Sequence, residues 1–75
     1  MNKIRRTKIK EQIEAMEIIK SSIEDILSEE QDAFDNMPES LQYSDRGETS
    51  QEAIDSMENV LSSLEEALEE LEAIA

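Results

Sequence analysis

Residues 34–48 read FDNMPESLQYSDRGE and separate two long segments whose apolar residues recur with helical spacing. This stretch holds the only proline of the chain, Pro38, its only glycine, Gly47, and both aromatic residues. Proline lacks a backbone donor and disfavours helical geometry in the residue before it, so a helix arriving from the N-terminal side should end near Met37. The stretch therefore predicts a joint about which two helices fold back on one another.

The segment before the joint carries a stripe of residues at alternating steps of four and three. This seam consists of Ile9, Ile13, Met16, Lys20, Ile23, Leu27, Glu30, Phe34 and Met37. It is broadened on one side, at seven-residue spacing, by Ile19, Ile26 and Ala33. A stripe three positions wide in each heptad is wider than a two-stranded coiled coil needs and is typical of a helix with neighbours on two sides. The pattern predicts a first helix over about residues 4–37.

The segment after the joint repeats this pattern. Its seam consists of Ile54, Met57, Leu61, Leu64, Leu68, Leu71 and Ala75, and its flank of Ala53, Val60, Ala67 and Ile74. The start of this helix has two candidates. Thr49 with Glu52 fits a capping box, and Asp45 with Glu48 offers an earlier start. We prefer Thr49, which predicts a joint over residues 38–48 and a second helix over about 49–75.

Within the joint, Pro38 suits the first position of a brief helical turn, and Gly47 permits a backbone conformation that other residues resist. Phe34, Met37, Leu41 and Tyr43 are candidates to close the end of the core.

Two polar residues, Lys20 and Glu30, interrupt the first seam where the second carries Leu61 and Leu71. Polar seam residues often fix register or oligomeric state. The alternative is that both lie at the edge of the stripe, with the Lys20 stem extending outward. Residues 16–27 also align without gaps to residues 57–68, which fits either an internal duplication or the general likeness of acidic amphipathic helices.

Charge is distributed very unevenly. The first ten residues contain five basic residues and no acid, whereas residues 11–75 contain two basic and twenty acidic residues, and the net charge is −13. A field this negative repels nucleic acid and anionic membranes, so we expect neither as a direct partner. In an antiparallel hairpin the basic start should pair with the acids of the last helical turns, which are Glu65, Glu66, Glu69, Glu70 and Glu72. The alternative is an arm that binds nucleic acid or a partner.

The composition argues against catalysis and bound cofactors. Without cysteine or histidine, the chain has no disulfides, no thiolate or imidazole metal ligands, and no imidazole to activate its serines. It contains no glycine-rich phosphate loop and no calcium-loop spacing. We expect a non-enzymatic protein without cofactors or metal. No transmembrane span or secretory signal is visible, which favours a cytoplasmic location.

The fold class that follows is all-α, with residues 1–75 forming a single domain. We expect an antiparallel two-helix hairpin resembling a coiled coil. Because the stripes are too broad to be covered by one pairing, we expect two copies to associate as a homodimeric four-helix bundle.

The joint also carries a family resemblance. Residues 30–42, EQDAFDNMPESLQ, followed by Ser44 and by Arg46-Gly47, resemble the central segment of small uncharacterised helical-hairpin proteins of Gram-positive bacteria and their phages. The resemblance covers the joint well and the helices only in kind. It implies a helical hairpin and an origin in a mobile element, and it brings no catalytic residues.

Two functional hypotheses follow. In the first, the acidic helices, with Glu65, Glu66, Glu69 and Glu70 as contact residues, form a phage or mobile-element inhibitor that occupies a basic surface of a host protein. The alternative explanation of this charge is solubility alone. In the second, the chain is a scaffolding homo-oligomer whose joint presents Phe34, Leu41, Tyr43 and Arg46 to a partner.

Overall fold

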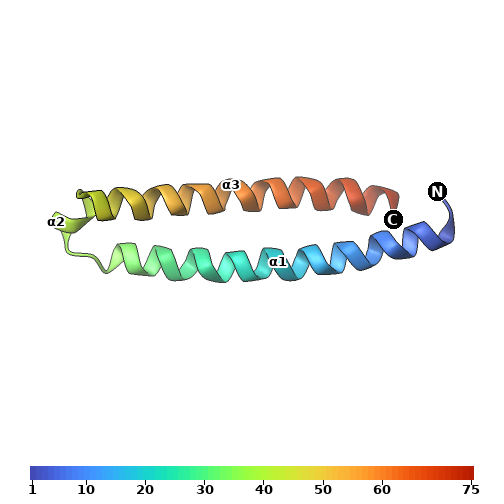
Figure 1. The fold of residues 1–75 in the computed structure, drawn as a ribbon, viewed down its shortest axis with the longest axis horizontal. Helices are drawn as coiled ribbons and strands as arrows, with labels where there is room; N and C mark the ends of the chain where they lie inside the picture. The colour runs from blue at the N-terminus through green and yellow to red at the C-terminus, as the bar shows by residue number, and fades with distance from the viewer.

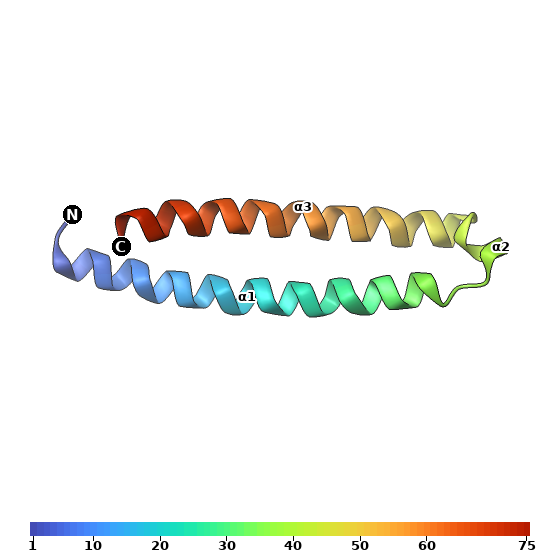
Figure 2. The same ribbon diagram turned by 180° about the vertical axis from the view of Figure 1, so that it is seen from behind.

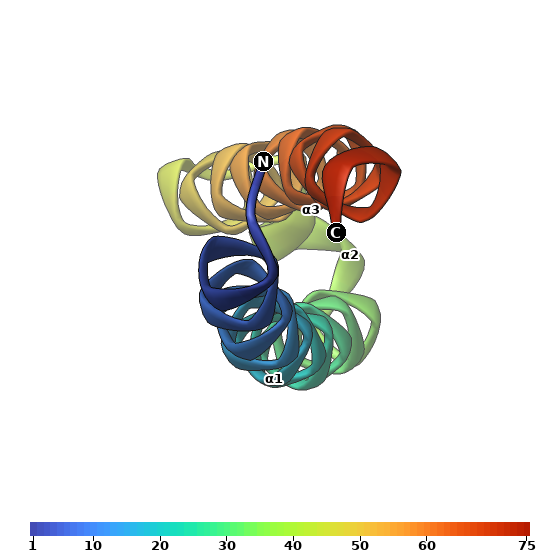
Figure 3. The same ribbon diagram turned by 90° about the vertical axis from the view of Figure 1, so that its right-hand side faces the viewer.

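The computed structural model describes all 75 residues and consists of three helices (Figure 1). They are α1 (Lys3–Asp35), α2 (Glu39–Gln42) and α3 (Asp45–Ile74). The all-α class predicted from the sequence is confirmed. The long helices α1 and α3 lie side by side in opposite directions, and α2 lies at the turn between them (Figures 1 and 2). The molecule measures 58 × 15 × 13 Å, so it is one elongated hairpin with no further layer covering either long helix (Figure 3).

Local sequence sets both ends of α1. The Asn2 side chain accepts a hydrogen bond from the Arg5 amide at 2.9 Å, which satisfies one of the free donors of the first turn. At the other end the helix stops at Asp35, and the Asn36 amide still donates to the Asp32 carbonyl. Pro38 follows in an extended conformation, with φ −54° and ψ 142°, and is the N-cap of α2, one residue before the first helical position that the sequence predicted for it. The proline therefore ends the first helix within two residues of the predicted position.

The start of α3 corrects the sequence-based prediction. The helix begins at Asp45, after Ser44, so residues 45–48 belong to α3 and Thr49 lies inside it. The acids Asp45 and Glu48 occupy the first turn, where negative charge is favourable because the helix dipole is positive there. The capping box at Thr49 is not used, because the earlier start adds a further turn to the helix pair.

Gly47 has a role different from the predicted one. Its φ is not positive, so no left-handed conformation is required of it. It is a buried helical residue, and a Cβ atom placed on it would lie 2.6 Å from the Cα of Gln42 and closer still to the Gln42 carbonyl. Glycine stands here because α2 packs directly against the backbone of α3.

The seam forms the contact between the two long helices. Every predicted seam residue except the terminal Ala75 is buried or half-buried, and the most deeply buried is Ile54, with 1% of its surface exposed. Gly47 and Ser50 continue the same spacing toward the joint and are also buried. The core is thus a single narrow line of side chains, and only five residues fall below about a tenth of their full exposure.

At the joint, side-chain hydrogen bonds hold the turn. The Gln42 amide group donates to the carbonyls of Phe34 and Met37, at 3.1 and 3.3 Å, which satisfies free acceptors at the end of α1. The Ser44 hydroxyl donates to the Leu41 carbonyl. These hydrogen bonds connect α2 to the end of α1 and to the start of α3.

Neither long helix contains a stretch apolar enough, over sufficient length, to span a lipid bilayer.

Candidate interaction surfaces

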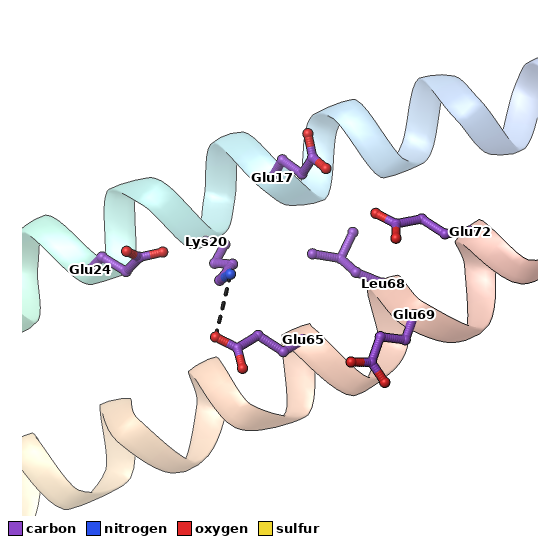
Figure 4. Close-up of a pocket in the computed structure, with 7 residues that line it drawn as sticks. All are labelled: Glu17, Lys20, Glu24, Glu65, Leu68, Glu69 and Glu72. Carbon is purple, nitrogen blue, oxygen red and sulfur yellow. Dashed lines mark ion pairs between the residues drawn. The ribbon is translucent and has the colours of Figure 1, made fainter.

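The first surface is a shallow acidic groove that runs along one side of the hairpin, between α1 and α3 (Figure 4). We define the acidic groove by the residues that line it, which are Glu17, Lys20, Glu24, Glu65, Leu68, Glu69 and Glu72. Toward the joint it continues past Leu27, Asp32, Glu58 and Leu61. Five carboxylates thus surround one lysine and one leucine. No group of three acidic residues converges closely enough to hold a metal ion.

Polar contacts across the helix pair come from the two polar seam residues. Lys20 Nζ lies 3.3 Å from Glu65 Oε1 and forms the only ion pair of the chain (Figure 4). The Ser50 hydroxyl donates to Glu30 Oε1 at 2.7 Å. Both Lys20 and Glu30 are half-buried, and each meets a polar partner on the other helix. This geometry favours the register-fixing interpretation of these residues over a position at the edge of the stripe.

The predicted acidic contact residues do not all lie together. Glu65 and Glu69 line the groove, whereas Glu66 and Glu70 do not and are exposed elsewhere on α3. Sequence reasoning missed Glu17, Glu24 and Glu72. Their heptad position could have identified these three residues, because each one directly follows a seam residue. Glu58 and Glu65 occupy the same position. In an antiparallel pair, equivalent flanks of the two helices fall on the same side of the hairpin.

The second surface lies on the other side of the seam. We define the apolar flank as the apolar residues at seven-residue spacing that each directly precede a seam residue, which are Ile19, Ile26 and Ala33 on α1 and Ala53, Val60, Ala67 and Ile74 on α3. At 100° per residue, positions before and after the seam project to opposite sides of a helix. Since the acidic positions of α1 and α3 share one groove, the apolar positions of both helices share the opposite face.

The apolar flank is open to solvent. The exposed fractions are 51% for Ile19, 53% for Ile26, 45% for Val60 and 48% for Ile74. Nearby positions on this side carry small side chains at Ala15, Ser22, Ser56 and Ser63 and carboxylates at Glu29 and Glu70, and all six are exposed. The hairpin therefore has two unlike faces, one lined with carboxylates and the other mainly with aliphatic and small side chains.

The third surface is the joint. Tyr43 is 81% exposed and Leu41 is 38% exposed, and Arg46 is exposed beside them on α3. The prediction that Tyr43 and Leu41 close the core is therefore wrong. Phe34 and Met37 are half-buried and do contribute to that end. Gln42 is the residue that lies against Gly47 of α3, and the next residue, Tyr43, is directed to solvent.

The basic start forms none of the expected ion pairs with the acids of α3. The register accounts for part of this result. Because residue 30 faces residue 50, equal steps along the two helices place residue 5 opposite residue 75, and residues 1–4 extend beyond the end of α3 (Figure 1). Lys8 and Lys10 lie at the level of Glu72 and Glu70, yet neither forms an ion pair with them. Glu65 lies far enough inside the hairpin to meet Lys20 instead.

Comparison of the chain with protein-family models, with curated proteins and with solved structures gives no match.

Proposed function

We propose that this chain is a non-enzymatic protein that acts through protein–protein contacts, and that its first contact is with a second copy of itself in a four-helix bundle. The observation that supports the proposal is the apolar flank. Aliphatic side chains at seven-residue spacing on both long helices remain about half exposed in the single chain. A contiguous apolar face on a soluble hairpin is typical of an interaction surface.

The exposed area is consistent with this proposal. A compact monomer of 8.6 kDa exposes about 4,700 Å², whereas this chain exposes 5649 Å². The excess is roughly 950 Å², which is comparable to the ~800 Å² that each partner buries in an interface of standard size. A second copy is therefore of the right size to cover what the hairpin leaves open.

Pairing through the apolar flanks leaves the acidic groove of each copy facing outward. We propose that this groove contacts a basic surface of another protein. In its most concrete form the protein is a cytoplasmic inhibitor, encoded by a phage or another mobile element, that covers the nucleic-acid-binding surface of a host protein. Carboxylates on rigid helices present fixed negative charge at low entropic cost, and such complementarity sets specificity and association rate. Direct binding of nucleic acid or membrane is not part of the proposal.

Two measurements test this function. Sedimentation equilibrium at micromolar concentration should find a dimer, and an Ile19→Lys/Ile26→Lys variant should sediment as a helical monomer because two charges cannot be buried in an apolar interface without partners. A wild-type chain that remains monomeric would refute self-association.

The acidic groove is tested separately with matched charge changes. A Glu17→Gln/Glu24→Gln/Glu72→Gln variant neutralises three groove carboxylates. The control, Glu11→Gln/Asp25→Asn/Glu52→Gln, neutralises three exposed carboxylates outside the groove and away from the apolar flank. In pull-downs at low and high salt, a basic partner should be retained at low salt by wild type and control and lost with the groove variant. Equal loss with both variants would mean that only total charge matters.

A second candidate function is supported by the exposed joint. In this alternative the chain is a scaffolding homo-oligomer, and Leu41, Tyr43 and Arg46 contact the partner. The exposure of Tyr43 supports this proposal. Its ring is 81% exposed on an otherwise acidic surface, so a partner that covers it would bury much apolar surface. A Tyr43→Ala variant should then lose the partner without a change in melting temperature. A fall in melting temperature would instead show that Tyr43 supports the fold.

A further inference from the structure

The two ends of the hairpin carry very unequal charge. At the open end, residues 1–10 contain five basic residues and no acid, residues 66–75 contain four acids, and none of these basic groups forms an ion pair within the chain. At the joint end, residues 29–48 contain seven acidic residues and one basic residue. The long axis measures 58 Å, far more than the screening length of about 8 Å at physiological salt. Each end therefore interacts only with charges brought directly beside it.

From this distribution we propose that the two copies pair in an antiparallel, two-fold symmetric dimer, so that the joint of each copy lies beside the basic start of the other. This proposal rests on the self-association proposed above and specifies its geometry. Two arrangements place the apolar flanks face to face. In the joint-opposed arrangement, α1 packs on α1 of the second copy and the joints lie at opposite ends. In the joint-together arrangement, α1 packs on α3 of the second copy and both joints lie at one end.

Charge distinguishes the two arrangements. The joint-together dimer gathers a balance of −12 at the joint end and +2 at the open end, twice the −6 and +1 of each chain. The joint-opposed dimer places the basic start of one copy beside the seven acids of the other joint and spreads the charge evenly, at −5 for each end. Complementary charge fixes orientation in an interface more than it adds affinity. The basic start, which has no intrachain partner and partly overhangs α3, then finds carboxylates on the second copy.

The apolar flank is compatible with this arrangement. A two-fold axis midway between Ile19 and Ile26 places Ile19 of one copy against Ile26 of the other, and it likewise pairs Val60 with Ala53. Ser22 and Ser56 then lie nearest the axis, and their small side chains allow the helix backbones to approach closely. The same symmetry places Gln12 of one copy at the level of Ala33 of the other.

Cysteine cross-linking tests the arrangement directly, because the chain contains no native cysteine. Single variants, at the exposed positions 12 and 33 and the half-buried positions 31 and 67, are mixed in pairs and oxidised. The Gln12→Cys and Ala33→Cys pair reports the joint-opposed dimer, and the Gln12→Cys and Ala67→Cys pair reports the joint-together dimer. Gln31→Cys, mixed with Gln12→Cys, is the matched control, since residue 31 lies at nearly the same level as residue 33 but lines the acidic side.

We expect a disulfide-linked dimer mainly from the Gln12→Cys and Ala33→Cys mixture. Predominant cross-linking of Gln12→Cys with Ala67→Cys would overturn the joint-opposed arrangement but would still support self-association. Cross-linking of the Gln31→Cys control as fast as of Ala33→Cys, or a dimer that none of these pairs cross-links, would show that the apolar flank is not the interface. If the chain sediments as a monomer and no pair cross-links, self-association itself fails.

Discussion

Replacement of Gly47 by alanine tests the packing of α2 against α3. The added methyl group would lie 2.6 Å from Gln42 Cα and closer to the Gln42 carbonyl, so backbone atoms of α2 would have to move. Forced repacking of this kind typically costs about 1–3 kcal/mol. The movement also strains the two hydrogen bonds from the Gln42 side chain to Phe34 and Met37, each worth about 1 kcal/mol. Alanine in a helix recovers about 1 kcal/mol relative to glycine.

The net expectation for Gly47→Ala is a loss of about 2 kcal/mol, equivalent to a fall in Tm of roughly 8–16 °C for a domain of this size. Thermal unfolding followed by circular dichroism at fixed protein concentration measures the change. Ser62→Ala, at an exposed position of α3 outside both the apolar flank and the acidic groove, is the control and should change stability by no more than about 0.5 kcal/mol. In a Gln42→Ala background the cost of Gly47→Ala should shrink, because the same hydrogen bonds are already absent. A Gly47→Ala protein more stable than wild type would refute the close approach of α2.

Three further substitutions test individual contacts by the same unfolding assay. Ser50→Ala removes the donor to the half-buried carboxylate of Glu30 and should cost about 1–2 kcal/mol; no change would mean that water replaces the hydroxyl. Lys20→Leu should stabilise the chain by about 1 kcal/mol, because an ion pair to the exposed Glu65 is weak and the seam gains an aliphatic side chain. Destabilisation would show that the ion pair contributes more to stability than the added apolar contact. Thr49→Ala should be neutral or slightly stabilising, since Thr49 lies inside α3, whereas a loss of about 1 kcal/mol would identify Thr49 as the helix cap.

The seam was predictable from the sequence because its periodicity extends over more than four heptads in the first helix and about three in the second. An exception at one position, such as the polar Lys20 or Glu30, does not obscure a pattern of this length. The helix end near Pro38 was predictable for a different reason, since proline acts through local geometry alone.

The start of α3 was not predictable from capping preferences. Thr49 matches a capping box, yet Gly47 and Ser50 prolong the seam and Ile54 anchors it, so packing against α1 and α2 decides the boundary. The role of Gly47 was predicted wrongly for the same reason. Glycine is needed at this position because a side chain would clash with Gln42 of α2, and local rules about turn conformation do not reveal a contact with another element.

The interaction surfaces were only partly predictable. The acids of α3 were visible as a group, but the partners contributed by α1, Glu17 and Glu24, appear only when antiparallel pairing brings equivalent flanks together. The overhang of residues 1–4 beyond α3 depended on register, which Glu30 and Ser50 set across the two helices. Tyr43 was misplaced because the direction of its side chain depends on how α2 packs.

The central claim is that the hairpin has two unlike faces, of which the apolar one is covered by a second copy. Alkylation rates of single cysteines placed on the two faces of α3 test this claim most directly. Val60→Cys places a thiol on the apolar flank, and Glu58→Cys places one on the acidic side, two residues away. We predict that the Val60→Cys thiol reacts progressively more slowly as protein concentration rises through the dimerisation range, while the rate for Glu58→Cys stays constant. Rates that are independent of concentration at both positions, or protection at position 58 alone, would contradict the account.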